Sequence, residues 1–60
     1  MFDYDKFVFL FHFYEWDRTP EENEWLAQRY SYWKSREYTD QQARENAFFD
    51  FKYKETNEDE

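Results

Sequence analysis

Aromatic side chains are unusually dense in this 60-residue sequence, in which Phe, Tyr and Trp make up 28% of the residues. A chain of this length buries only about 60% of the surface that its unfolded form exposes, and each aromatic side chain has roughly 150–250 Å² to bury. One small core therefore cannot enclose all of the rings. Because the sequence has no Cys and a single His, we expect association with another polypeptide, rather than disulfides or a metal, to supply the missing stability.

The densest aromatic segment, residues 6–15, permits two interpretations. As a β-strand it places alternate Phe residues, from Phe7 to Phe13, on one face. As an α-helix it is apolar on all sides. The acids Glu15 and Asp17 would then lie at the negative, C-terminal end of the helix dipole, which is unfavourable. The aromatic and β-branched content favours the strand, and we expect self-association through Phe9, Phe11, Phe13, Tyr14 and Trp16.

The absence of Gly decides how such a strand could pair. Tight hairpin turns prefer Gly, together with Asn or Asp, and no such turn interrupts residues 1–16. The strand is therefore expected to pair with a second copy of the chain, in a homodimer, or with residues 49–54.

A helix is predicted from Pro20 to about Glu37. The Thr19 hydroxyl is suited to cap it, Pro20 to occupy its first position, and Glu22 to complete a capping box. On this helix Asn23 is expected on the polar side, opposite the apolar residues Trp25, Leu26, Tyr30, Tyr32 and Trp33.

A second capping box at residues 39–42 predicts another helix that reaches at least Phe51. Ala43 and Ala47 share one face of this helix with Phe51, and the two small side chains allow the first helix to approach closely. Since the link between the helices is short, we expect an antiparallel helical hairpin.

The fold class predicted from these elements is α+β, with one N-terminal strand followed by the helical hairpin (β-α-α) and strand pairing across a dimer. An all-α three-helix arrangement is the alternative. A single domain is expected over residues 1–54. Residues 55–60 are expected to form a disordered acidic tail, because they carry four acids and no side chain suited to a core.

Basic and aromatic residues alternate over residues 29–38, a mixture found in proteins that bind single-stranded nucleic acids. Packing of the bases on rings of the same helix explains the pattern more simply, and the net charge of −7 opposes attraction to phosphate. Nucleic acid is therefore not the partner that we expect. We predict instead that Arg29, Tyr30 and Trp33 bind another protein.

A strand followed by two helices in about sixty residues resembles the ribbon-helix-helix family of DNA-binding regulators. The resemblance implies the alternative function, a small dimeric nucleic-acid-binding regulator. The chain departs from that family in the strand face, where Val8, Leu10, His12 and Tyr14 stand in place of polar or basic residues, and in the link between the helices, which lacks a small residue. No DNA-reading residue can be transferred.

The sequence offers little for catalysis or cofactor binding. His12 is the only His and lies within the aromatic segment, away from any nucleophile motif. Helix-dipole capping explains the acids at positions 21, 22 and 24 without a metal, and a phosphate-binding loop of the usual type would need Gly. We therefore expect no enzyme activity, no cofactor and no metal.

The apolar run Phe7–Tyr14 is far shorter than a membrane span, and the acids Asp3 and Asp5 stand where a signal peptide requires positive charge. The absence of Cys indicates a reducing, cytoplasmic compartment. Because the apolar run is short and has acidic flanks, which anionic lipids would repel, we expect no membrane contact. We predict a small acidic regulatory protein that binds another protein through an exposed aromatic surface. Accessory or inhibitory proteins of phages have this character.

Overall fold

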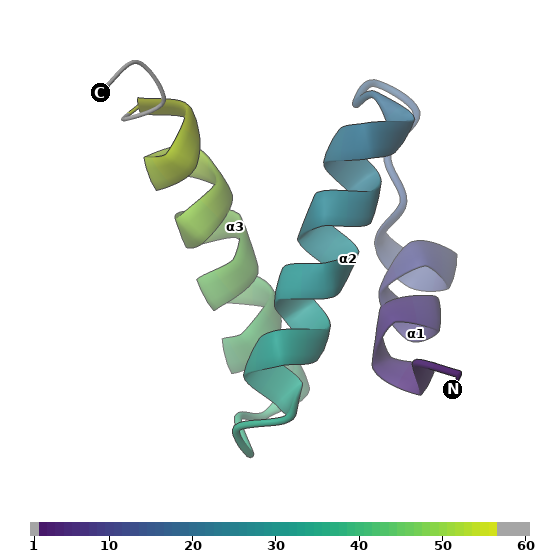
Figure 1. Cartoon of the computed structure of the whole chain (residues 1–60), viewed down its shortest axis with the longest axis vertical. Helices are drawn as coiled ribbons and strands as arrows, with labels where there is room; N and C mark the ends of the chain where they lie inside the picture. Colours follow the sequence, from purple (N-terminus) through teal and green to yellow (C-terminus); the bar gives the residue numbers. More distant parts are fainter. Residues whose placement is uncertain (1, 57–60) are drawn as a thin grey trace.

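The computed structural model describes residues 2–56 and, within them, contains three helices and no strand. They are α1 (Tyr4–Phe13), α2 (Pro20–Lys34) and α3 (Asp40–Thr56) (Figure 1). The fold is therefore the all-α alternative, and the prediction of an α+β fold with a strand pairing across a dimer is wrong. Of the predicted disordered tail, residues 55 and 56 are instead the end of α3, and residues 57–60 lie outside the described part of the chain.

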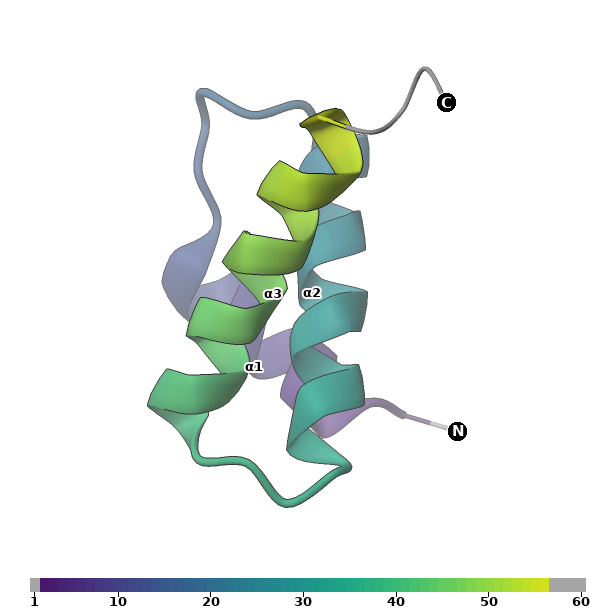
Figure 2. The same cartoon turned by 90° about the vertical axis from the view of Figure 1, so that its left-hand side faces the viewer.

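The helices run up, down and up, with α2 in contact with both of the others. α2 and α3 lie close together at the turn that joins them and diverge toward their other ends (Figure 1). Seen from the α3 side, α1 lies behind the α2–α3 hairpin (Figure 2). The hairpin predicted from the two capping boxes is confirmed. α2 begins at Pro20 as predicted and ends at Lys34, three residues before the predicted end at Glu37.

Two polar groups explain why the aromatic segment forms a helix. At the N-terminal end of α1 the Asp3 carboxylate accepts a hydrogen bond from the Lys6 backbone N–H at 3.0 Å. At the other end the Arg18 guanidinium donates to the Phe13 carbonyl oxygen at 2.9 Å. The positive charge of Arg18 at the negative end of the helix dipole offsets the unfavourable negative charges of Glu15 and Asp17, on which the preference for a strand partly rested.

The core lies where the three helices meet. Phe9 of α1 is fully buried and packs against Tyr30 of α2, with ring centroids 5.3 Å apart, and against Phe48 of α3 at 5.9 Å. Ala43 and Ala47 leave room for α2 to approach α3, as predicted. The fully or almost fully buried apolar residues are Phe9, Leu26, Ala27, Tyr30, Ala43 and Ala47.

A buried asparagine holds the link between α1 and α2. The Asn23 side chain is fully buried on α2. Its amide oxygen accepts from the Glu15 N–H at 3.2 Å and from the Arg18 Nε at 3.0 Å, and its amide nitrogen donates to the Glu15 carbonyl at 2.9 Å. Asn23 therefore provides hydrogen-bond partners for the backbone N–H and carbonyl of Glu15 in the link. The prediction that Asn23 lies on the polar side of the helix is wrong, because the side chain is buried.

The turn between α2 and α3 contains a left-handed residue that is not glycine. Glu37 has φ of 72°. Its N–H donates to the Lys34 carbonyl at 3.0 Å and the next N–H, of Tyr38, donates to the Trp33 carbonyl at 3.4 Å. This pair of bonds is a Schellman motif, and the Trp33 and Tyr38 rings supply its usual apolar contact at 5.2 Å.

Glu37→Gly is expected to raise the free energy of unfolding by about 0.5–1 kcal/mol, because Gly adopts a positive φ without steric cost. Urea denaturation followed by circular dichroism would measure the difference. Ser35→Gly serves as the control, since Ser35 lies in the same turn with φ of −67° and its replacement should lower stability. Loss of stability in both variants would contradict the account of the turn.

Candidate interaction surface

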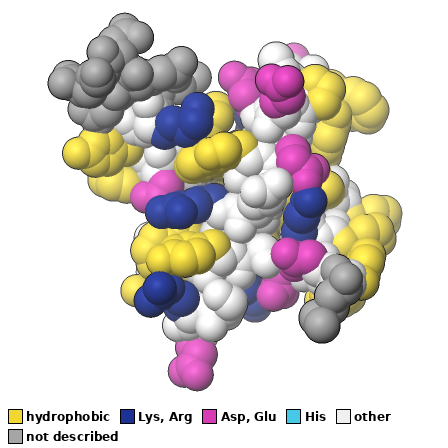
Figure 3. Space-filling view, viewed as in Figure 1, with side chains coloured by type: hydrophobic (Ala, Val, Ile, Leu, Met, Phe, Trp, Pro, Cys, Tyr) yellow, Lys and Arg dark blue, Asp and Glu magenta, His cyan; other side chains and the backbone are white. Residues whose placement is uncertain are grey.

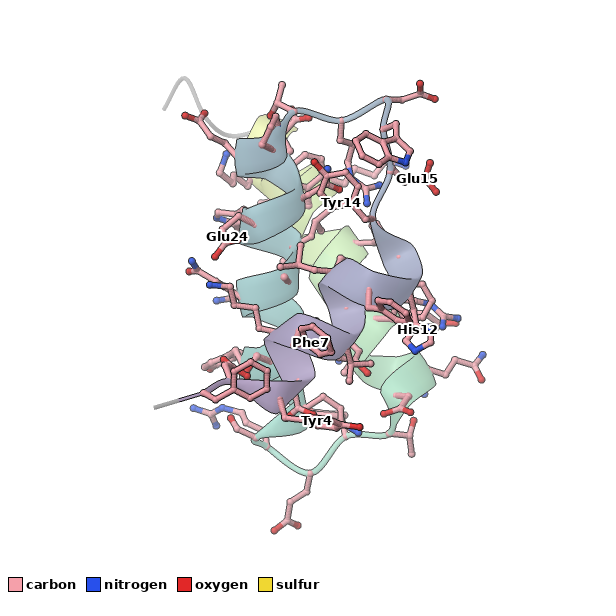
Figure 4. The ribbon with its side chains drawn as sticks, turned by 90° about the vertical axis from the view of Figure 1, so that its right-hand side faces the viewer. Tyr4, Phe7, His12, Tyr14, Glu15 and Glu24 are labelled. Carbon is pink, nitrogen blue, oxygen red and sulfur yellow. The ribbon has the colours of Figure 1, made fainter. Side chains whose placement is uncertain are left out.

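Four aromatic side chains lie exposed along the outward face of α1 and the residues just before it. Figure 4 shows two of them, Tyr4 and Phe7, on the side of α1 that faces the viewer, with the other two helices behind. The exposed fractions are 70% for Phe2, 68% for Tyr4, 49% for Phe7 and 73% for Phe11. We call these residues the α1 stripe.

Three of the four rings of the α1 stripe, those of Phe2, Phe7 and Phe11, contact one another. Phe7 and Phe11 are one helical turn apart and lie nearly parallel, with ring centroids 6.0 Å apart and an interplanar angle of 15°. Phe2 packs against Phe7 at 5.6 Å. In the space-filling view, hydrophobic side chains lie along the edge where α1 is found, and charged side chains separate them from α2 (Figure 3). Phe2, Phe7 and Phe11 therefore form a continuous aromatic surface, and Tyr4 is exposed on the same side of α1 as Phe7 (Figure 4).

Polar contacts to α2 fix the rotation of α1 that turns this surface outward. Lys6 forms a salt bridge with Glu24, and the Ser31 hydroxyl donates to the Asp3 carboxylate at 2.8 Å. The hydrogen bond from Lys6 lowers the pKa of Glu24. The Lys6 backbone N–H, followed by the Ser31 hydroxyl, lowers the pKa of Asp3. Both carboxylates therefore hold α1 on α2 best when they are ionised.

The structure separates the five residues predicted for self-association. Phe11 and Trp16 are exposed, the latter to 88%. Phe9 is buried in the core, where it cannot contact another chain. Phe13 and Tyr14 are half-buried, and the Phe13 ring lies between Phe9 and the Arg44 guanidinium.

The exposed residues Phe2, Tyr4 and Phe7 were missing from the predicted set. The signal that finds Tyr4, Phe7 and Phe11 is their spacing of three and four residues, which places them on one side of a helix. The alternation of Phe along a strand hid this spacing.

The three residues predicted to bind a partner are engaged within the chain. Tyr30 is buried, and its hydroxyl donates to Asp40 at 3.3 Å; burial, followed by the Asp40 charge, raises its pKa. Arg29 Nε donates to Asp50 at 2.8 Å and Trp33 Nε1 donates to the same carboxylate oxygen at 2.9 Å. These contacts join α2 to α3.

The described residues offer little reactive chemistry. His12 is exposed, with its ring between those of Phe11 and Phe13. Within residues 2–56, no three His, Asp or Glu side chains gather as metal ligands would. A shallow depression on α2 is lined by Trp25, Gln28, Arg29 and Tyr32, which carry no nucleophile paired with a base.

None of the helices in the described part of the chain is long and apolar enough to cross a membrane. Comparison of the chain with protein-family models, with curated proteins and with solved structures gave no match. Function is therefore inferred from the geometry of the described residues.

Proposed function

We propose that the chain is a small non-enzymatic protein-interaction module and that the α1 stripe is its contact surface. The observation that supports this most strongly is the exposure of four aromatic side chains, three of them in ring contact, along a helix whose opposite face is already packed. Contiguous exposed apolar surface of this kind is typical of sites where proteins bind one another.

The exposed rings are not a by-product of an incomplete core. Phe9 fills the space between α2 and α3, and no buried side-chain polar atom among the described residues lacks a hydrogen-bond partner. Phe7 and Phe11 could be replaced by polar residues without opening that core. Their exposure costs about 25 cal/mol for each Å² of apolar surface left in water, and a binding partner would recover this free energy.

The charge of the chain is consistent with an accessory or inhibitory role in which apolar contact gives affinity. A net charge of −7 keeps a chain this rich in rings in solution. The absence of Cys supports a reducing, cytoplasmic setting.

The nucleic-acid alternative finds less support, because its basic residues have partners within the chain. Arg29 binds Asp50, and the guanidinium groups of Arg29 and Arg36 lie over the Tyr32 ring at 4.7 and 4.9 Å. These contacts within the chain occupy the guanidinium groups and the aromatic ring face that would otherwise bind phosphates and stack on bases.

Photo-crosslinking in the cells that make the protein would test the proposal. Benzoylphenylalanine replaces Phe11 in one variant and Phe49, which is 69% exposed on α3, in the control. We expect a polypeptide adduct at position 11 and none at position 49. The adduct should disappear when Tyr4→Ser and Phe7→Ser are added. Absence of an adduct at position 11, or equal adducts at both positions, would reject the α1 stripe as the contact surface.

A further inference from the structure

We propose that the α1 stripe binds the same stripe of a second copy of the chain, with the two α1 helices antiparallel about a two-fold axis. This pairing rests on the interaction function proposed above and names its partner. It is a contact between helix faces, because the backbone groups of residues 4–13 are used within α1.

The stripe has the shape of a seam between two helices. At about 100° per residue, Tyr4, Phe7 and Phe11 fall within an arc of about 60°. Their spacing of three and then four residues is that of the a and d positions of a coiled coil, which face one partner helix. Phe2 lengthens the seam through its contact with Phe7.

The exposed area is sufficient for a modest dimer. With the exposed fractions above and roughly 150–250 Å² for each aromatic side chain, the stripe presents on the order of 500 Å². A symmetric pair would therefore remove about 1,000 Å² from water, the lower limit for a specific interface. The chain needs no other partner to cover this surface.

The acids at the N-terminal end of α1 favour the antiparallel direction. Asp3 and Asp5 lie at this end, so a parallel pair would bring the like charges of both copies together. An antiparallel pair with its axis between Phe7 and Val8 places Tyr4 of one copy opposite Phe11 of the other and keeps the acids at opposite ends of the seam.

Sedimentation of the purified full chain over a range of concentrations tests the pairing. We expect a species of twice the 7.8 kDa chain mass to form as concentration rises. Phe11→Asp should weaken it at least about tenfold, because the symmetric pair loses the contact between positions 11 and 4 twice. Phe49→Asp replaces a similarly exposed ring on α3 and should leave it unchanged. Circular dichroism would show that both variants keep their helices.

Single cysteines test the direction, because the sequence has none of its own. In the antiparallel pair position 4 of one copy faces position 11 of the other. A mixture of Tyr4→Cys and Phe11→Cys should therefore form mainly the mixed disulfide on mild oxidation. A disulfide between two copies of Tyr4→Cys, in preference to the mixed one, would overturn the antiparallel arrangement.

A chain that stays at 7.8 kDa at high concentration would overturn the pairing. If benzoylphenylalanine at position 11 still captured a different polypeptide, the interaction function would stand with another partner. If the chain stayed monomeric and position 11 captured no polypeptide, both the self-pairing and the interaction function would be rejected. Binding of the monomer to phosphatidylcholine vesicles that is lost in Phe11→Asp would assign the stripe to lipid and likewise overturn self-pairing.

Discussion

Asn23→Ala is expected to lower the free energy of unfolding by about 2–4 kcal/mol, because it removes three hydrogen bonds at a fully buried site. The Glu15 N–H and carbonyl and the Arg18 Nε would lose their partner. Arg18 would then be less well placed to donate to the Phe13 carbonyl at the end of α1. For a chain of 60 residues, whose total stability is on the order of 3–9 kcal/mol, this loss is large. Urea denaturation followed by circular dichroism would measure it.

Two further variants show whether the effect comes from the hydrogen bonds. Gln28→Ala changes an exposed residue of α2 and should alter stability by less than about 0.5 kcal/mol. Asn23→Asp keeps an oxygen that can accept from Glu15 and Arg18 but loses the donor to the Glu15 carbonyl, so it should fall between the wild type and Asn23→Ala. Equal stability of Asn23→Ala and Gln28→Ala would show that Asn23 does not hold the link.

Phe9→Ala is expected to lower the free energy of unfolding by about 3–5 kcal/mol and to leave much of the chain unfolded at room temperature. The Phe9 ring contacts rings of all three helices, those of Phe13, Tyr30 and Phe48. Its removal leaves a cavity at the point where they meet. Thermal unfolding measured by far-ultraviolet circular dichroism would report the loss.

Phe7→Ala provides the matched control for Phe9→Ala, since both remove a Phe side chain from the middle of α1. The Phe7 ring is half-exposed, and its ring contacts within residues 2–56 are with Phe2 and Phe11 of the stripe. At a concentration low enough to keep the chain monomeric, Phe7→Ala should cost less than about 1 kcal/mol. Equal losses in the two variants would contradict the orientation of α1.

Local capping made the α2–α3 hairpin predictable. The Thr19 hydroxyl accepts from the Glu22 N–H at 3.1 Å, and the Glu22 carboxylate accepts from the Thr19 N–H at 3.1 Å. The Thr39 hydroxyl accepts from the Gln42 N–H at 3.2 Å. These bonds join residues three apart, so the sequence alone contains both partners of each.

The helical state of α1 was not predictable in the same way, because a distant partner stabilises its C-terminal end. Arg18 lies five residues beyond Phe13, in the link to α2, and is positioned by Asn23. Burial of Asn23 depends in turn on how the link folds over α2. Once α1 is wrongly taken as a strand, Phe9 and Phe11 fall on one face, and the surface and core residues cannot be separated.

Within α1, adjacent odd-numbered Phe residues serve opposite sides: Phe9 and Phe13 face the hairpin, whereas Phe7 and Phe11 face solvent. Within this one ten-residue helix, the residues that pack the core and the residues that form the exposed surface are thus largely different. Substitutions on the solvent side can change what the molecule recognises while its architecture persists. Specificity can therefore diverge faster than shape, and a redesign of binding could begin at Tyr4, Phe7 and Phe11 alone.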